Sequence, residues 1–308
     1  MATAVRYSEY GGPEVLHWVE IEEPHAGEGQ VRVAVRTAGM NPFDYKVRRG
    51  GYIPNHTLPA GQGAEFAGVI DEVGDGVTGW TVGDEVLGFV GTGAQASHIV
   101  VPAKNVTAKP ADLDWATAAG IGLVSNTAKR AVDSLGLGPG DTVLVTAAAG
   151  GVGIPTVQFA LATGATVVGT ASESNHDFLR ELGAIPVAYG PGADGTSEVE
   201  RLRAAAPNGY TAVLDNKGGD ALLTALDLGV DPARVNTIAD RDNAEKHGFA
   251  TVGGTGKTAE ELAEFARQAA SGDLIIPVRR TYPAAHVADA YRDLETGHGR
   301  GKLVLTID

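Results

Sequence analysis

The sequence of 308 residues contains no cysteine. Disulfide bonds, thiolate metal sites and a cysteine nucleophile are therefore excluded. Basic residues are also few, with 24 Lys and Arg against 38 Asp and Glu, which gives a formal net charge of -14. Because nucleic acids and anionic membranes bind basic surfaces, we expect neither of them as a partner.

Long apolar segments are absent as well. No uncharged apolar run is long enough to span a bilayer, and the first residues, MATAVRYSEYGGPEVLHWVE, lack the apolar core of a signal peptide. We therefore expect a soluble protein of the cytoplasm. Hydrophobic residues make up 43% of the chain, enough for ordinary globular cores, and the length predicts two domains.

The pattern along the chain predicts three parts. Residues 1–118 read as short strands separated by turns, as in the alternating QVRVAVRTAG, and indicate a β-rich, barrel-like domain. One helical segment is expected from residue 114 to the glycines at 136–140. Strands and helices then alternate up to residue 256, which predicts a parallel sheet covered on both faces. The strands and helices of residues 257–308 are expected to return to the first domain, so the predicted fold class is α/β.

The segment TVLVTAAAGGVG, residues 142–153, turns from a strand into a glycine-rich loop before a helix. It fits the dinucleotide fingerprint G-x-G-x-x-G with Ala148 in the first position and Gly150 and Gly153 in the others. The middle position lets a pyrophosphate approach the backbone, and the third lets the helix pack close to the strand. The phosphates would meet free N–H groups at the helix N-terminus. The expected contacts are Ala149, Gly150, Gly151, Val152 and Gly153; the alternative is a flexible turn.

The end of the second strand of this domain indicates which cofactor is bound. An NAD enzyme places Asp or Glu there to hold the ribose hydroxyls. This chain has Ser172, followed by Glu173, Asn175 and His176. Hydroxyl and amide donors, with positive charge from His176 or Arg180, suit a 2′-phosphate and favour NADPH. Glu173 favours NADH.

Four segments carry a family resemblance over nearly the whole chain: AAAGGVGIPTVQFA, GAEFAGVIDEVGDGVTGWTVGDEV, GMNPFDYKVRRGGY and the closing GRGKLVL. They resemble the medium-chain dehydrogenase/reductase superfamily and, within it, the zinc-free NADPH:quinone reductases and enone reductases. The resemblance implies a GroES-like catalytic domain at 1–118 and 257–308 with a Rossmann NADP-binding domain at 119–256. It also implies a homodimer, paired through edge strands at ARVNTIAD and FATVGG.

The resemblance departs from the zinc-dependent branch at one segment. Zinc alcohol dehydrogenases of this superfamily carry Gly-His-Glu where this chain has Gly63-Ala64-Glu65. The eight histidines are dispersed, so no metal is expected, and Glu65 is expected to serve structure. Without a Lewis acid, hydride addition to an electron-poor acceptor, a quinone or a C=C conjugated to a carbonyl, fits better than reversible alcohol oxidation.

The segment N-P-x-D-x-K lies beside the nicotinamide in the family. Asn41 and Lys46 are therefore expected to orient the nicotinamide or to polarise the acceptor carbonyl, and Tyr45 or Tyr52 to line the substrate slot. A tyrosine hydroxyl could also donate the proton that follows hydride transfer. The alternative is structural, because Asn-Pro is a good turn and Lys46 could lie on a solvated face.

Further cofactor contacts are implied by position in the family. Thr127 resembles a threonine on the nicotinamide side, and Tyr189 an adenine or 2′-phosphate contact. Asn216 follows a strand at the edge where open α/β sheets bind ligands. Ile238 and Gly253 occupy similar strand-end positions and are expected to approach the nicotinamide.

Three functions remain in competition on the sequence. We expect an NADPH-dependent reductase of a small quinone or α,β-unsaturated carbonyl. The alternatives are an enoyl or polyketide-type reductase acting on a thioester, and an NADPH-binding protein without turnover.

Overall fold

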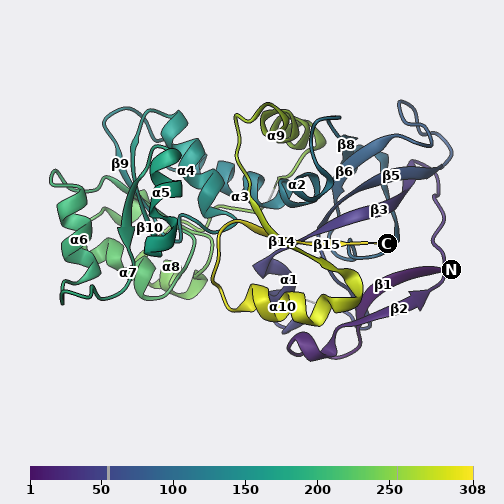
Figure 1. Ribbon diagram of the computed structural model, residues 1–308, viewed down its shortest axis with the longest axis horizontal. Helices are drawn as coiled ribbons and strands as arrows, with labels where there is room; N and C mark the ends of the chain where they lie inside the picture. The colour runs from purple at the N-terminus through teal and green to yellow at the C-terminus, as the bar shows by residue number, and fades with distance from the viewer. Residues whose placement is uncertain (54–55, 255, 308) are drawn as a thin grey trace. The chain divides into compact units, whose positions relative to one another are not determined.

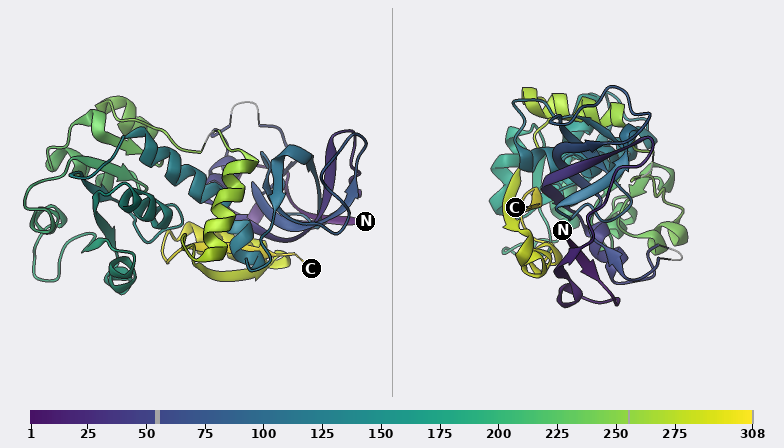
Figure 2. Two further views of the ribbon diagram at one scale, coloured as in Figure 1. Left: turned by 90° about the horizontal axis from the view of Figure 1, so that it is seen from above. Right: turned by 90° about the vertical axis from the view of Figure 1, so that its right-hand side faces the viewer.

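The computed structural model describes residues 1–53, 56–254 and 256–307. The chain divides into two compact units: unit 1 comprises Met1–Leu123 and Lys257–Asp308, and unit 2 comprises Val124–Gly256. The first and last described residues, Met1 and Ile307, lie in unit 1 (Figures 1 and 2). The helix α2 (Trp115–Gly120) packs on strands of unit 1 and belongs to it.

Unit 1 is built on two β-sheets whose neighbouring strands are antiparallel, except for β14 and β15, which pair in parallel. A seven-stranded sheet has the order β14-β15-β3-β5-β6-β8, with β7 paired to β3, and a three-stranded sheet has the order β2-β1-β4. The bounds are β1 Ala2–Tyr7, β2 His17–Ile21, β3 Gln30–Met40, β4 Ala60–Gly61, β5 Glu65–Val73, β6 Glu85–Phe89, β7 His98–Pro102, β8 Val106–Ala108, β14 Val278–Pro283 and β15 Lys302–Thr306. The alternation of QVRVAVRTAG places Val31, Val33 and Val35 in the core, as predicted for a half-buried strand.

The tail of the chain adds two strands and two helices to unit 1. Strand β15 lies between β14 and β3, and the helices are α9 (Ala259–Ser271) and α10 (Val287–Glu295). Residues from Lys257 onward thus belong to the same compact unit as the first part of the chain. The remaining helix of this unit is α1 (Pro42–Arg48), and the short 3-10 helices are η1 Pro13–Val15, η2 Ala103–Asn105 and η5 Ala284–His286.

The prediction of a single helical segment from residue 114 is wrong about the number of helices. The chain forms two helices, α2 and α3 (Gly122–Ser134), with a break at Ile121. The glycines on each side of the break lie against the tail: a Cβ on Gly120 would be 3.3 Å from Lys302 Cε, and one on Gly122 would be 3.0 Å from Leu262 Cδ1. The segment is thus shaped by contacts with residues far along the chain.

Unit 2 contains a parallel five-stranded sheet of order β11-β10-β9-β12-β13. The strands are β9 Thr142–Val145, β10 Thr166–Ala171, β11 Ile185–Ala188, β12 Ala212–Asp215 and β13 Val235–Thr237. The helices that follow α3 are α4 Gly153–Ala162, α5 His176–Glu181, α6 Glu198–Ala205, α7 Asp220–Asp227 and α8 Arg241–His247, with η3 Glu173–Asn175 and η4 Pro232–Arg234. Numbered within the unit, the strand order is 3-2-1-4-5, the doubly wound order of dinucleotide-binding folds.

Helices cover both faces of this sheet (Figure 1). Successive residues of one strand enter different cores: Val143 and Val145 of β9 pack in one hydrophobic cluster, and Leu144 packs in the other. A strand buried on both faces reads as a continuous apolar run, as TVLV does. The predicted α/β fold class, with a β-rich unit and a doubly wound unit, is confirmed.

The strand predicted at FATVGG does not form. Only Ala250 makes an isolated parallel bridge, to Asn236. Beyond it the Asn236 side chain replaces the ladder, because Nδ2 donates to Val252 O at 3.0 Å and Oδ1 accepts from Val252 N at 2.7 Å. The sheet therefore ends at β13, and the homodimer expected through this edge stays a prediction.

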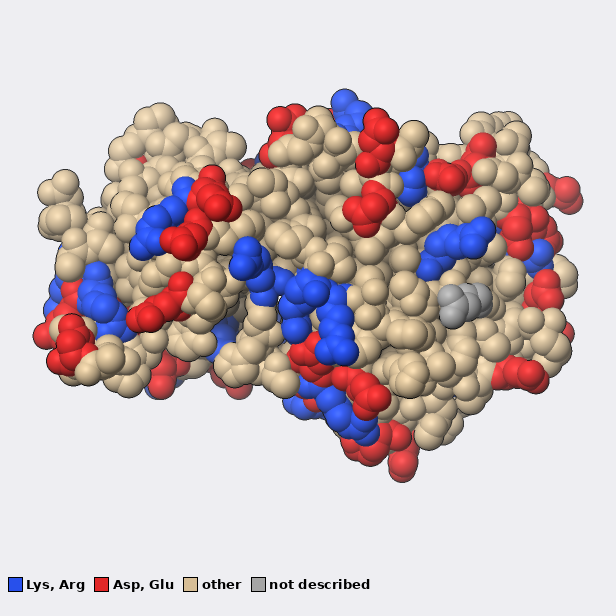
Figure 3. Space-filling view, in the orientation of Figure 1, with Lys and Arg blue, Asp and Glu red and all other residues tan. Residues whose placement is uncertain are grey.

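Charged side chains of both signs mix on the surface shown in Figure 3. Several basic residues are paired with acids, for example Arg279 with Asp293 at 2.8 Å and Arg292 with Asp289 at 2.5 Å. Among the described helices, none is both long enough and apolar enough to cross a bilayer.

Candidate functional site

The glycine-rich turn between β9 and α4 has the geometry that its sequence predicts. Helix α4 begins at Gly153, where a Cβ would lie 2.1 Å from Ala147 O and 2.8 Å from Ala148 Cα. No side chain fits there, because real Cβ atoms do not approach backbone atoms so closely. At Gly150 a Cβ would lie 3.1 Å from the same carbonyl oxygen. Ala147 itself has φ 47, so the turn starts in the left-handed region.

The alanine in the first fingerprint position is accommodated by the neighbouring strand. A Cβ on Gly169 of β10 would lie 2.7 Å from Ala148 Cβ, so a side chain at 169 would exclude the alanine. Ala148 N also donates to Thr170 O at 2.9 Å. Sequence reasoning missed Gly169, and the signal that could have found it is a glycine inside the strand run TVVGTA.

The residues after β10 form a hydroxyl and amide cluster. Ser172 Oγ lies 3.1 Å from Ser174 Oγ and accepts a hydrogen bond from Asn175 Nδ2 at 2.9 Å. His176 Nε2 is buried and has no hydrogen-bond partner among the described residues. The charge of Arg180 is partly compensated by Asp177, because Arg180 Nη1 lies 2.7 Å from Asp177 Oδ1. The cluster thus brings the predicted residues Ser172 and Asn175 together, next to a histidine with one unpartnered buried nitrogen among the described residues.

Three of the predicted nicotinamide-side residues also lie together. A Cβ on Gly253 would be 3.0 Å from Ile238 Cγ2 and 3.4 Å from Thr127 Cγ2. Tyr189, by contrast, is 51% exposed after the end of β11. Asn216 lies at the end of β12, where Nδ2 donates to Thr146 O at 3.0 Å.

A buried carboxylate at the ends of three strands was missed by sequence reasoning. Asp215 Oδ1 accepts from Thr146 Oγ1 and Asp215 Oδ2 accepts from Thr237 Oγ1, each at 2.6 Å. These bonds tie β12 to the residue after β9 and to β13, at the edge where ligands bind in such sheets. The signal was the acidic residue that ends the apolar run AVLD.

In unit 1, Asn41 precedes α1 and is 1% exposed. Its backbone N–H donates to Asp44 Oδ2 at 2.8 Å, which completes a capping box at the start of the helix. Its side-chain Nδ2 donates to Glu65 Oε1 at 2.8 Å, and its Oδ1 accepts from Lys302 Nζ at 2.5 Å. The Asn-Pro segment is thus a helix start, and the side chain belongs to a buried network.

This network, which we call the Lys302 cluster, comprises Lys302, Glu65 and Asn41. Lys302 Nζ donates to Glu65 Oε1 at 2.9 Å and to Met40 O at 3.0 Å. Glu65 Oε2 accepts from Leu123 N at 2.8 Å. The side chains of Lys302 and Glu65 are 2% and 3% exposed. The cluster joins the end of β3 with the starts of β5 and β15 and with the α2–α3 break.

Of the other residues predicted to act with Asn41, two lie close together and the third lies elsewhere, against the hydrophobic core. Lys46 Nζ lies 5.7 Å from the ring centroid of Tyr52, and that ring meets Phe43 edge-on at 5.7 Å. Lys46 and Tyr52 are therefore brought together. Tyr45 packs against the hydrophobic core with Arg49 Cζ 5.1 Å from its ring, and burial raises its pKa. The roles of all three in catalysis stay predictions.

Asp44 is a buried acid beside the cluster. Burial raises its pKa to about 7, against the opposing effects of the Asn41 N–H and the charge of Lys302. Asp44 Oδ2 accepts from Tyr291 Oη at 3.1 Å, and that hydroxyl accepts from Gln95 Nε2 at 2.8 Å.

The raised pKa predicts a pH dependence of stability. Between about pH 4 and about pH 7 the folded protein holds a proton at Asp44 that the unfolded chain has released, so stability falls as pH rises, by up to about 1.4 kcal/mol per pH unit from this group. Urea unfolding at several pH values measures the slope. Asp44→Asn should lose this contribution, and an unchanged slope in the variant would assign it elsewhere.

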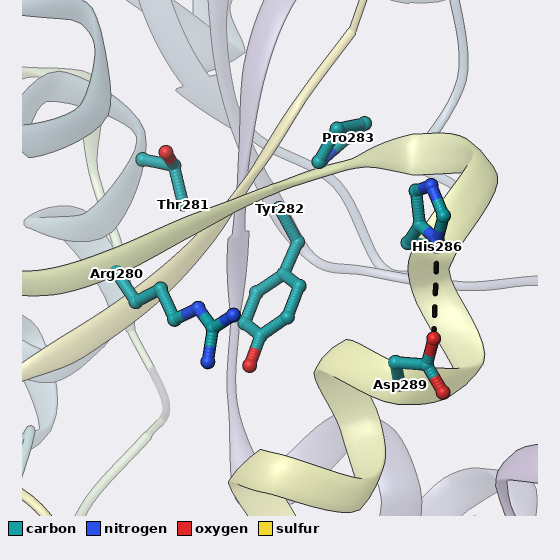
Figure 4. A pocket seen from close by; sticks show the side chains of 6 residues that line it. All are labelled: Arg280, Thr281, Tyr282, Pro283, His286 and Asp289. Carbon is teal, nitrogen blue, oxygen red and sulfur yellow. Dashed lines mark ion pairs between the residues drawn. The ribbon is translucent and has the colours of Figure 1, made fainter.

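A separate hollow of about 470 Å³ lies beside β14 and the start of α10 (Figure 4). In it Arg280 Cζ lies 4.5 Å from the centroid of the Tyr282 ring. Its lining is Arg280, Thr281, Tyr282, Pro283, His286 and Asp289. None of the residues predicted for cofactor or substrate lines this hollow.

Two family models match the chain. Residues 27–111 match the alcohol dehydrogenase GroES-like domain, and residues 182–305 match the zinc-binding dehydrogenase. The quinone oxidoreductase of Rattus norvegicus is 30% identical over 99% of this chain and 97% of its own length. The chloroplastic NADPH-dependent alkenal/one oxidoreductase of Arabidopsis thaliana is 31% identical over 97% of this chain and 78% of its own length. Polyketide synthase GfsB of Streptomyces halstedii is 36% identical over 95% of this chain, which spans 5% of that protein.

Solved structures agree with these relatives. The quinone oxidoreductase from Coxiella burnetii has a TM-score of 0.88 at 28% identity, covering 100% of this chain and 99% of that one. The Escherichia coli quinone oxidoreductase complexed with NADPH has a TM-score of 0.84 at 27% identity, covering 99% of each chain.

The zinc named in the second family model does not fit the residues of this chain. Ala64 stands where the zinc-dependent branch has a histidine ligand, and the adjacent Glu65 is bound by the Lys302 ammonium. In the described part of the chain, no group of three or more His, Cys, Asp or Glu side chains could hold a metal ion. On relatives that match it at near full length and on its two-unit fold, this chain belongs to the medium-chain dehydrogenase/reductase superfamily and is an enzyme of its quinone oxidoreductase branch.

Proposed function

We propose that this protein is an NADPH-dependent reductase that transfers hydride to a quinone or to the C=C of an α,β-unsaturated carbonyl compound, without zinc. The observation that carries the proposal is the Lys302 cluster: the glutamate of the Gly63-Ala64-Glu65 segment is held by an internal ammonium and is not available to a metal. An enzyme without a Lewis acid suits an acceptor that is already electron-poor.

The choice of cofactor is supported by the turn between β9 and α4 and by the cluster after β10. At Gly150 and Gly153 the backbone of the turn carries no side chain, and the start of α4 is where a pyrophosphate would bind in this proposal. Ser172 and Asn175 supply a hydroxyl and an amide where an NAD enzyme has an acid. The buried His176 Nε2 has no hydrogen-bond partner in the described part of the chain, and a phosphate oxygen could fill that role. One similar protein is named an NADPH-dependent oxidoreductase, and one similar solved structure is complexed with NADPH.

When bound, NADPH supplies a hydride to one carbon of the acceptor, and the adjacent carbon or the oxygen takes a proton, so that the acceptor gains two electrons and two hydrogens. We assign to Asn41 the donation of a hydrogen bond to an acceptor oxygen, and to Lys46 the stabilisation of negative charge that develops there. Tyr52, beside Lys46, lines the substrate slot in this proposal.

A second candidate function has a specific observation in its favour. The chain is 36% identical to part of a polyketide synthase, a higher identity than to the quinone oxidoreductases reported above. The second candidate is therefore reduction of an enoyl group held as a thioester.

One assay separates these candidates. The purified protein is given NADPH, and separately NADH, with a quinone, a short enone, an enoyl-CoA and an aldehyde, and the loss of reduced-cofactor absorbance is followed. Oxidation of NADPH with the quinone or the enone, faster than with the aldehyde, supports the proposal. Faster turnover of the enoyl-CoA supports the second candidate. Tight NADPH binding without turnover of any acceptor would make the protein a binder rather than a reductase.

Cofactor preference should depend on Ser172. Ser172→Asp places a carboxylate beside the 2′-position, where it repels a phosphate and accepts from a ribose hydroxyl, so the ratio of kcat/KM for NADPH to that for NADH should fall about tenfold or more. Ser8→Asp, a change at an exposed serine of unit 1, is the matched control. An unchanged ratio in Ser172→Asp would remove this residue from the cofactor site.

We also propose a cytoplasmic homodimer, from the analogy with the family. Sedimentation equilibrium of the purified protein tests the dimer directly.

A further inference from the structure

We infer that Lys302 is a positioning residue: with Glu65, it sets the direction in which the Asn41 amide donates its remaining hydrogen to a bound ligand. The inference deepens the proposed reductase site and rests on that function. It gives a role to the lysine of the closing segment GRGKLVL, whose buried side chain has no other use in the proposed chemistry.

The chemistry of the two neighbours decides how the Asn41 amide is turned. An ammonium has donors only, and a carboxylate has acceptors only. Lys302 Nζ at 2.5 Å therefore requires the amide oxygen, and Glu65 Oε1 at 2.8 Å requires the amide nitrogen. A flipped amide would put N–H groups against the ammonium and oxygen against the carboxylate. An uncharged pair of neighbours would impose no such choice.

The cluster is saturated except at one atom. The three hydrogens of the Lys302 ammonium have three acceptors: Met40 O, Asn41 Oδ1 and Glu65 Oε1. Both Glu65 oxygens accept hydrogen bonds. Asn41 Nδ2 has two hydrogens, and in the part of the chain that the structure describes only one of them has an acceptor.

A buried N–H without an acceptor is costly, so this second hydrogen calls for an oxygen from a ligand. The carbonyl of an enone or quinone, and the carboxamide of the nicotinamide, share the required chemistry. The ammonium on Oδ1 also polarises the amide, which makes its N–H groups stronger donors. An internal lysine thus supplies fixed positive charge beside Ala64, where the zinc-dependent branch has a metal ligand.

The test replaces the ion pair by a neutral pair of similar size, Lys302→Met with Glu65→Gln. This avoids an uncompensated buried charge while removing the constraint on the amide. The control is Lys109→Met with Glu85→Gln, because Lys109 Nζ lies 3.0 Å from Glu85 Oε2 in the same unit and its side chain is 4% exposed. Far-UV circular dichroism first establishes that each double variant is folded.

For the Lys302 pair we expect kcat with the quinone or enone to fall about tenfold to a hundredfold, from the loss of one oriented hydrogen bond. NADPH affinity should change less than about threefold when the ligand is the acceptor carbonyl, whereas a loss of NADPH affinity of about tenfold identifies the nicotinamide carboxamide as the ligand. The carbonyl acceptor KM should change little, since the bond strengthens as the oxygen gains charge. The control pair should keep kcat. Equal kcat in a folded Lys302 pair, or an equal loss in the control pair, would overturn the inference.

A second measurement does not depend on turnover. Selective ¹⁵N-asparagine labelling gives the side-chain signals of Asn41, assigned by their loss in Asn41→Ala. Exchange of the Nδ2 hydrogens should be slow in the parent protein and at least about tenfold faster in the Lys302 pair, because both anchors are weakened. An unchanged exchange rate of the Asn41 Nδ2 hydrogens in the Lys302 pair would contradict the positioning role. If the parent turns over no acceptor, the proposed function fails, and this exchange result still decides the inference.

Discussion

Replacing Lys302 alone by methionine should destabilise the protein by about 3–5 kcal/mol, because it leaves the carboxylate of Glu65 buried and unpaired. The ammonium that compensates this charge also donates to Met40 O and Asn41 Oδ1, so three hydrogen bonds are lost at once. Urea unfolding of the variant against the parent measures the loss of free energy.

The comparison that identifies the cause is the double variant Lys302→Met with Glu65→Gln. It should recover most of the lost stability, because removal of both charges leaves no buried ion. If the double variant is as unstable as the single one, the loss comes from the packing of the lysine stem and not from charge. Lys109→Met is the parallel single change at another buried lysine, whose partner Glu85 is 49% exposed and can be solvated. It should therefore cost clearly less.

The other large effect is expected at the glycine turn. Gly153→Ala would bring a Cβ to 2.1 Å from Ala147 O, so the first turn of α4 must move away from β9. We expect a loss of NADPH affinity of about a hundredfold or more, since the N–H groups at the helix start no longer converge on the phosphates, and a loss of stability of a few kcal/mol. Fluorescence titration with NADPH and thermal unfolding measure the two effects.

Alanine substitutions at two other glycines of unit 2 serve as comparisons for Gly153→Ala. Gly150→Ala brings a Cβ to 3.1 Å from the same oxygen, a contact that a small shift relieves, so its effect should be smaller. A Cβ on Gly138 would have no atom within 4 Å, so Gly138→Ala should leave both the NADPH affinity and the stability close to those of the parent. Equal affinities in Gly153→Ala and Gly138→Ala would show that the turn does not bind the cofactor.

Local patterns predicted the elements whose causes lie within the segment. The alternation of residues 30–39 and the run TVLV indicated a half-buried strand and a fully buried one, and the structure has β3 and β9 there. The glycine spacing predicted that Gly153 must lack a side chain, and the clash distance at that position confirms it. In each case a short-range steric or burial requirement appears directly in the residue pattern.

Other features depend on residues that are distant in the chain. The break between α2 and α3 arises where Gly120 and Gly122 face Lys302 and Leu262, more than a hundred residues later, so helical spacing alone indicated one continuous helix. The strand expected at FATVGG fails because the side chain of Asn236 takes the hydrogen bonds of Val252. Neither partner is visible from within the segment.

In the candidate site too, some residues could be identified from the sequence, whereas one contact could be found only in the structure. Asn41 and Glu65 stand in motifs that the sequence shows, and the resemblance to the family implied that Ala64 stands in the place of a metal ligand. That a lysine at position 302 binds both Asn41 and Glu65 follows only from the placement of β15 beside β3. By itself the sequence determined the residue types, the strand and helix periods and the glycine turn, because these are local steric and burial effects. The tertiary structure decided which buried charges meet, because the energy of a buried ion depends on partners that folding brings from the other end of the chain.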